Sequence, residues 1–82
     1  MRGKNQIISV MKGLGFILEY DQWAVKHKKW MRFRHLKDIG KLQRFALIVY
    51  SVQKQDVILN NAADMLLKLG QHQKILQLNS YI

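Results

Sequence analysis

The chain has no cysteine, no proline and only five acidic side chains among its 82 residues. Without cysteine it can form neither a disulfide scaffold nor a cysteine zinc site, and such a composition is typical of a reducing compartment, so we expect a cytoplasmic protein. Without proline, the ends of helices have to be predicted from glycines and capping residues. No segment approaches the roughly 20 apolar residues of a membrane-spanning helix, so we expect no transmembrane segment.

The length of the chain predicts one small basic domain that spans residues 1–82. Fourteen lysines and arginines against five acidic residues give a formal net charge of +9. This charge is lopsided, because residues 1–37 carry nine basic and two acidic side chains, whereas residues 38–82 carry five and three. A basic surface of this kind predicts a polyanionic partner, which would be nucleic acid, an anionic membrane or an acidic protein.

The first segment has the pattern of a short helix. Its apolar side chains recur at three-to-four spacing, at Ile7, Val10, Met11 and Leu14. Asn5 is placed to cap the amino end of this helix, and Gly13 and Gly15 are placed to end it.

Alternating side chains follow this helix. They are Phe16, Leu18 and Tyr20 on one side, and Ile17 and Glu19 on the other. The apolar residues of 23–36 scatter around a helical wheel, but with a period of two Met31, Phe33 and His35 fall on one side. Because aromatic residues also favour strands, we expect a small antiparallel hairpin or meander here.

The second half has helical spacing. Asp38 is placed to cap a helix that continues to Val52, although residues 45–50 would also serve as a buried strand. Asp56 is placed to cap a second helix that ends at Gly70. The buried stripe of that helix is Leu59, Ala62, Leu66 and Leu69. Residues 71–82 continue with helical spacing.

The order of these segments predicts an α+β fold. It consists of a short N-terminal helix, a small antiparallel β-hairpin or meander, and then two or three helices. The alternative is an all-α fold.

The basic residues gather in one stretch, because no carboxylate occurs from Gln22 to Lys37. Its cations are Lys26, Lys28, Lys29, Arg32, Arg34 and Lys37, with Trp30 among them. Cations neutralise phosphates with release of counterions, and aromatic rings stack on bases. We therefore predict that these seven side chains bind nucleic acid through a basic strand segment. The alternative for the aromatic residues is burial in the core, which a chain of this size needs.

No residue pattern typical of an enzyme occurs. The histidines, His27, His35 and His72, are too dispersed for a pair of metal ligands on one helix. Glu19 and Asp21 lie beside many cations, so charge balance explains them better than acid–base catalysis. We expect no enzyme activity, no metal site and no cofactor.

Two motifs resemble a known family. They are Met11-Lys12-Gly13-Leu14-Gly15-Phe16 and, after basic residues, Met31-Arg32-Phe33-Arg34-His35-Leu36. The pattern, which runs on to Gly40, resembles the accessory segment after the nuclease domain of mobilisation relaxases. The nuclease tyrosine and the histidine-cluster domain are missing, so the resemblance implies no nicking of DNA and no catalytic residue. It does imply that DNA is favoured over RNA as the partner, and that the chain comes from a plasmid, phage or transposon.

The carboxy-terminal helices support a different function. They carry neutral amides opposite their apolar residues, at Asn60, Asn61, Gln71, Gln73 and Gln77. Such helices suit a protein-interaction module, for example a phage-type inhibitor or an assembly subunit that self-associates through them. The sequence therefore predicts a nucleic-acid-binding accessory or regulatory protein, with a protein-interaction module as the alternative. A homodimer and an acidic protein partner are both possible.

Overall fold

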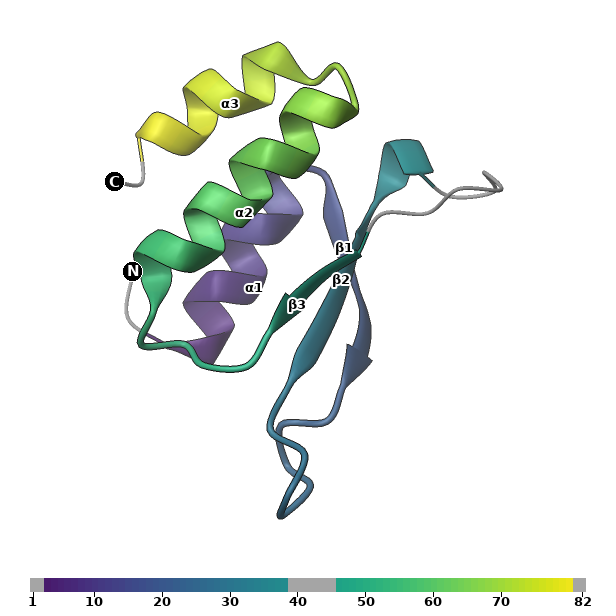
Figure 1. Cartoon of the computed structure of the whole chain (residues 1–82), viewed down its shortest axis with the longest axis vertical. Helices are drawn as coiled ribbons and strands as arrows, with labels where there is room; N and C mark the ends of the chain where they lie inside the picture. The colour runs from purple at the N-terminus through teal and green to yellow at the C-terminus, as the bar shows by residue number, and fades with distance from the viewer. Residues whose placement is uncertain (1–2, 39–45, 81–82) are drawn as a thin grey trace.

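The computed structural model describes residues 3–38 and 46–80, and these form a three-stranded sheet with helices (Figure 1). The elements are α1 (Lys4–Gly13), β1 (Phe16–Asp21), β2 (Met31–His35), the 3₁₀ helix η1 (Leu36–Asp38), β3 (Ala46–Val49), α2 (Gln55–Lys68) and α3 (His72–Asn79). The strands are antiparallel in the order β1-β2-β3. The prediction of an α+β fold with a meander is therefore confirmed.

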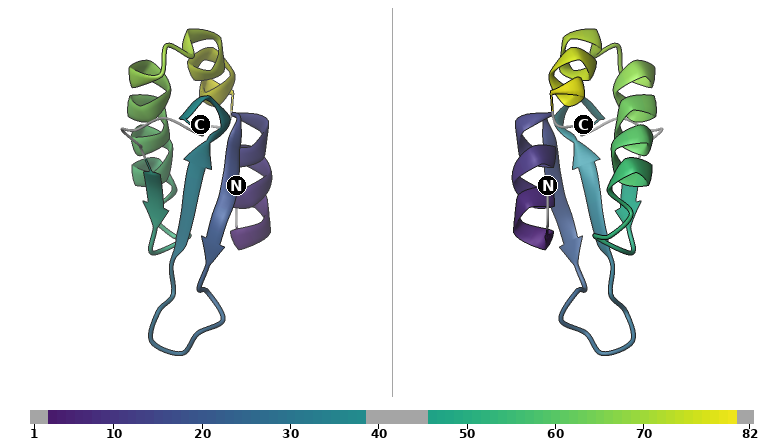
Figure 2. Two further views of the ribbon diagram at one scale, coloured as in Figure 1. Left: turned by 90° about the vertical axis from the view of Figure 1, so that its right-hand side faces the viewer. Right: turned by 90° about the vertical axis from the view of Figure 1, so that its left-hand side faces the viewer.

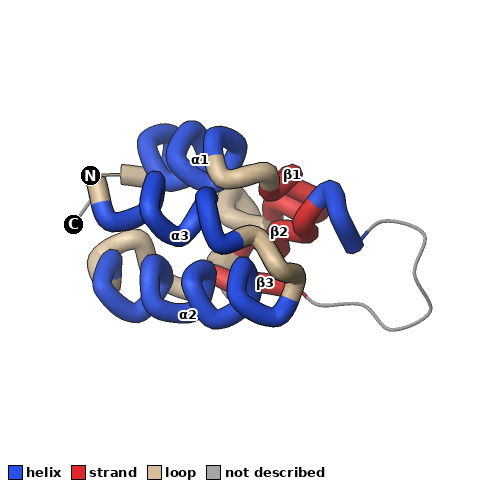
Figure 3. Tube along the Cα trace, turned by 90° about the horizontal axis from the view of Figure 1, so that it is seen from above, coloured by secondary structure: helices blue, strands red, loops and turns tan. Residues whose placement is uncertain are grey.

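The α-helices cover one face of the sheet. Helices α1 and α2 lie against it, and α3 lies between them on the side away from the strands (Figures 1 and 3). The buried apolar side chains from the strands are Phe16, Met31, Phe33, Leu47 and Val49. Those from the helices and the turn after α1 are Ile7, Met11, Leu14, Ile58, Leu59, Ala62, Met65, Leu66 and Leu78. The opposite face of the sheet carries Arg32 and Arg34 beside the exposed side chains of Ile17 and Ile48.

Helix α1 has the predicted apolar stripe but not the predicted cap. It begins at Lys4 with Gly3 as the capping residue, and the N–H of Ile7 donates to the carbonyl oxygen of Gly3. The prediction of Asn5 as the cap is wrong, because the helix begins before it. The predicted end is confirmed, since α1 ends at Gly13 and Gly15 has a left-handed φ of 94°.

Strand β1 contains a bulge at Glu19. Leu18 pairs with Phe33 and Tyr20 pairs with Arg32, so Glu19 is the additional residue. The bulge shifts the alternation of side chains by one position. As a result Tyr20 does not continue the side of Phe16 and Leu18, and it is 48% exposed on the outer face of the sheet.

The second half differs from the predicted helices at two places. Residues 46–49 form β3 and not a helix, because Leu47 and Val49 alternate into the core while Ile48 is exposed. Residues 39–45 of that predicted helix lie outside the described residues, and Asp38 lies in η1. Helix α2 begins at Gln55 after Lys54, so the cap predicted at Asp56 is also wrong. Its predicted end is confirmed by Gly70, which has a φ of 70°.

A buried histidine joins the turn after α1 to the end of β2. His35 is 2% exposed, and the N–H of Lys37 donates to its Nδ1 at 3.1 Å. Nδ1 is therefore the acceptor, so Nε2 carries the proton and donates to the carbonyl oxygen of Leu14 at 2.9 Å. The N–H of Leu36 donates to the carbonyl oxygen of Gly15, and the rings of His35 and Phe16 meet edge to face. These contacts fix a neutral imidazole at the junction.

The Gly15→Ala substitution tests how tightly this junction is packed. An alanine Cβ would lie 2.6 Å from His35 Nε2, in addition to adopting an unfavourable φ. At Gly70 nothing lies within 4 Å of such a Cβ, so Gly70→Ala is a matched control with the backbone cost alone. In urea unfolding we expect Gly70→Ala to lose about 1 kcal/mol, and Gly15→Ala to lose about 1–3 kcal/mol more. Equal losses in the two variants would contradict a close contact with His35.

His35 should make the stability of the protein depend on pH. Burial is the main cause that lowers the pKa of His35, with Lys37 and Lys74 adding to it, against Leu14 and Asp38. The unfolded chain therefore binds the proton more tightly than the folded one. We expect the full free energy of unfolding above a pH of about 6.5, and a loss as the pH falls below that value.

Urea unfolding and NMR measure this pH effect. The slope of stability against pH between about 7.5 and 5 should be smaller in His35→Gln, which cannot titrate. An NMR titration of the His35 ring should have its midpoint below that of a free histidine. A midpoint at or above the ordinary value would show that this account of the junction is wrong.

Candidate nucleic-acid interface

The connection between β1 and β2 is a folded loop, residues 22–30, that projects beyond the helices (Figures 1 and 2). The N–H of Gln22 donates to the carbonyl oxygen of Trp30 at 2.9 Å and closes its base. Turn hydrogen bonds from Val25 and Lys28 bend the chain between these ends. Residues 24–29 are exposed, so the side chains at the tip of the loop are available to a partner.

Three of the predicted cations lie together in this loop, which we call the lysine loop. They are Lys26, Lys28 and Lys29, and among the described residues none of them forms an ion pair. The nearest carboxylate along the chain is Asp21, which pairs with Lys4 and accepts from the N–H of Trp23. Those two hydrogen bonds lower the pKa of Asp21, so its charge is already engaged at the base of the loop.

Two further cations lie on β2 and share one carboxylate. Glu19 contacts Arg32 at 2.6 Å and Arg34 at 2.7 Å, on the outer face of the sheet. Arg34 is only 8% exposed, whereas the side chain of Arg32 is about a third exposed. The predicted pair of arginines does point to the same side, but it holds Glu19 there. Charge balance, as predicted for Glu19 and Asp21, is confirmed by these ion pairs.

An aromatic pair lies beside Arg32 on the outer face. The guanidinium carbon of Arg32 is 4.3 Å from the centre of the Tyr20 ring, and the rings of Tyr20 and Trp30 are 6.3 Å apart. The cation stacks on the tyrosine, so part of its surface is covered within the protein. Phe33 is in the core, whereas Trp23 and Trp30 are half-buried, so burial accounts fully for Phe33 alone.

Lys37 lies apart from the other predicted cations. It is exposed in η1, at the end of β2 opposite the lysine loop (Figure 1). Only Arg32 and Arg34 of the six cations are strand residues, so the prediction of one basic strand segment is wrong in its geometry. The structure divides that segment into an exposed loop, a strand face whose two arginines share the charge of Glu19, and a remote lysine.

Tyr20 and Glu19 are parts of this surface that sequence analysis did not place. The alternation of β1 assigned Tyr20 to the side of Phe16, and only the bulge brings it beneath Arg32. A bulge has no strong signal in a strand without glycine. Glu19 lies outside the carboxylate-free stretch 22–37, but the pairing of β1 with β2 brings it next to Arg32 and Arg34.

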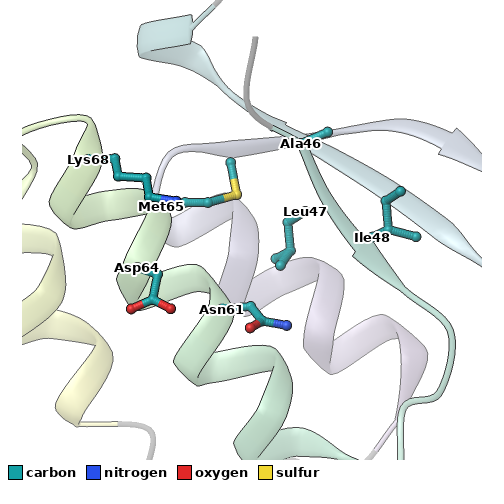
Figure 4. Close-up of a pocket in the computed structure, with 7 residues that line it drawn as sticks. All are labelled: Ala46, Leu47, Ile48, Asn61, Asp64, Met65 and Lys68. Carbon is teal, nitrogen blue, oxygen red and sulfur yellow. The ribbon is translucent and has the colours of Figure 1, made fainter.

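A cavity between β3 and α2 offers no comparable charge. It has a volume of about 230 Å³ and lies between Leu47 on the strand and Met65 on the helix (Figure 4). Its polar lining has one carboxylate, Asp64, and one ammonium group, Lys68, beside the amide of Asn61. Within residues 3–38 and 46–80 no group of histidines and carboxylates could hold a metal ion, and no helix is long and apolar enough to cross a membrane.

On the described surface, the lysine loop thus brings three exposed cations together without acidic partners. Its hydrogen-bonded base holds the three ammonium groups at the end of a strand pair. Function has to be inferred from this arrangement of charges. Comparison of the chain with protein-family models, with curated proteins and with solved structures gives no match.

Proposed function

We propose that the protein is a non-catalytic, nucleic-acid-binding accessory or regulatory protein that contacts DNA phosphates with its lysine loop. The observation that carries this proposal is the exposure of Lys26, Lys28 and Lys29 without ion pairs among the described residues. Cations that have no acidic partner can exchange their counterions for phosphates at little cost. The free energy of that exchange comes from the released counterions.

The form of the loop favours a duplex over a single strand. The major groove of B-DNA is about 12 Å wide and admits a two-stranded β-ribbon, with phosphates on both sides of it. The lysine loop is the end of such a ribbon and stands clear of the helices (Figure 2). Base stacking, by contrast, would need rings that are free, and Trp30 is half-buried beside Tyr20.

Two expectations from the sequence join this proposal. The resemblance to relaxase accessory segments favours DNA over RNA and a mobile element as the source. The cysteine-free composition favours action in the cytoplasm, where DNA of such elements is within reach. The proposed contacts with phosphates do not rely on either expectation, because they are inferred from the lysine loop alone.

The alternative is a protein-interaction module that self-associates through its carboxy-terminal helices. Leu67 on α2 and Leu76 on α3 favour it, because both are large apolar side chains that are more than half exposed. A homodimer formed there would bury these leucines and leave the lysine loop free for an acidic partner.

Replacing two loop lysines should weaken DNA binding in a salt-dependent way. For Lys28→Gln/Lys29→Gln we expect the slope of log K against log salt to fall by about 2 on a duplex with 5′-hydroxyl ends. The control is Lys54→Gln/Lys68→Gln, which removes the same charge at the two ends of α2, away from the loop (Figure 1). Its slope should change little.

Fluorescence anisotropy over a series of salt concentrations measures these slopes, with duplex DNA, single-stranded DNA and RNA in parallel. A wild-type slope near zero, or equal slopes for the two variants, would contradict the proposal. Light scattering in the same buffers supplies the molecular mass. A dimer that binds no nucleic acid would favour the protein-interaction module.

The carboxylate of Glu19 should restrain DNA binding by the outer face. In Glu19→Gln, Arg32 loses its acidic partner and becomes available to a phosphate, whereas Arg34 stays buried. We expect the salt slope to steepen by about 1. The free energy of unfolding should fall by about 1–3 kcal/mol, because a charged hydrogen-bond acceptor is lost.

Asp56→Asn is the matched control for this substitution, since it makes the same change of charge in the first turn of α2, on the other side of the sheet. An unchanged slope in Glu19→Gln, measured beside this control, would show that the outer face does not approach DNA.

A further inference from the structure

Three lysines that are distant in the sequence converge on a second basic site. Lys12 from the last turn of α1, Lys37 from η1 and Lys74 from α3 line one open cavity of about 390 Å³. The other residues around it are Gly13, Gly15, His35, Leu36 and Gln71. None of these described residues is acidic, so the cavity has a concentrated positive charge.

The cavity is built around the buried histidine junction. Lys74 Nζ donates to the carbonyl oxygen of Gly13 at 3.3 Å, and Gln77 Nε2 donates to the same oxygen at 3.2 Å. These bonds satisfy an end carbonyl of α1 and hold Lys74 above the turn. Lys74 Nζ also donates to Gln77 Oε1 at 3.5 Å, so one of its three N–H donors is left for a ligand.

The charges around His35 support the convergence of these lysines. Lys37 and Lys74 line the cavity together with His35. Their charges lower the pKa of His35, after the larger effect of its burial. Asp38 acts in the opposite direction, but it is fully buried and does not line the cavity. The first turn of α3, which begins after Gln71, adds the partial positive charge of a helix amino end.

The helix ends alone do not explain all three lysines. A lysine in the last turn of α1, and one that reaches Gly13, are both expected near the negative end of that helix. Lys37 has no such reason, because it belongs to η1 and not to α1. Lys12 and Lys37 are exposed and form no ion pair among the described residues, so their charges are open to a ligand.

We propose that this cavity binds a phosphate group, either of a small phosphate such as pyrophosphate or at the 5′ end of a nucleic acid. A compact multivalent anion fits, because lysines present point charges from three directions. A cavity of this volume falls within the range of about 300–1,000 Å³ that is usual for small-ligand sites. The site does not depend on the lysine loop, which lies at the opposite end of the sheet (Figure 1).

An NMR titration with sodium pyrophosphate at constant ionic strength tests the cavity. We expect saturable shifts of the amides of Gly15, Leu36 and Lys37. Lys12→Gln/Lys37→Gln should weaken binding by about tenfold or more, since each charged hydrogen bond lost costs a factor of that order. Neither side chain makes a described contact that holds the fold, so this variant should stay folded, as its spectrum would verify.

The loop variant Lys28→Gln/Lys29→Gln is the control and should bind pyrophosphate as the wild type does. That control separates this site from the proposed function, because DNA binding by the loop and phosphate binding by the cavity can fail independently. No saturable shift, shifts that concentrate in residues 22–30, or equal affinity in the Lys12→Gln/Lys37→Gln variant would each overturn the proposal.

Short oligonucleotides distinguish the two sources of phosphate. In the loop variant, a 5′-phosphorylated strand is compared with the same strand ending in a 5′-hydroxyl. Tighter binding of the phosphorylated strand, lost when Lys12 and Lys37 are also replaced, would support the cavity and assign it to nucleic-acid ends. If the two strands bind equally and pyrophosphate also binds, the result would support the proposed phosphate site and assign it to small phosphates.

Discussion

The hydrogen bonds of one buried imidazole determine how the end of β2 meets the turn after α1. His35 accepts from the N–H of Lys37 and donates to the carbonyl oxygen of Leu14, so it links the end of β2 to the end of α1. Only the neutral ring with its proton on Nε2 can make both bonds, because a second proton would face the N–H of Lys37. Gly15 has no side chain at the place where the ring lies, which permits the close approach. The pairing of Phe16 with His35 then begins the register of β1 with β2.

The bulge at Glu19 sets the charge of the sheet's outer face. Without the additional residue, Tyr20 would continue the side of Phe16 and would turn away from Arg32. With it, one carboxylate meets two arginines while the tyrosine ring lies beneath one of them. Arg32 and Arg34 therefore form ion pairs within the protein. A count of charges along a segment measures the composition of a surface but not which charges remain open on it.

Much of the fold was predictable from periodicity, and the failures have local causes. Burial of apolar side chains explains the stripe of α1 and the alternation of Met31 with Phe33. The need for a left-handed residue after a helix explains the glycines at the helix ends. Strand β3 was ambiguous, because its short apolar run suits a buried helix as well as a strand, and only pairing with β2 decides. The seven predicted site residues form one stretch of the sequence, but the structure separates them into the loop, β2 and η1. Their separation depends on where β2 begins and on the bulge in its neighbour, which single-sequence patterns do not indicate.

The separation of the exposed lysines limits how the protein can bind a polyanion. A uniformly basic strand would lay its charges along one line, whereas here the exposed ones lie at opposite ends of β2, with Glu19 compensating the arginines between them. A ligand at one end is separated from the other by the length of the sheet, which exceeds a Debye length of about 8 Å at physiological salt. The two ends therefore act as independent electrostatic sites. The same excess of positive charge opposes close association of two copies, so the exposed leucines of α2 and α3 would form a dimer only if the buried apolar area outweighed that repulsion.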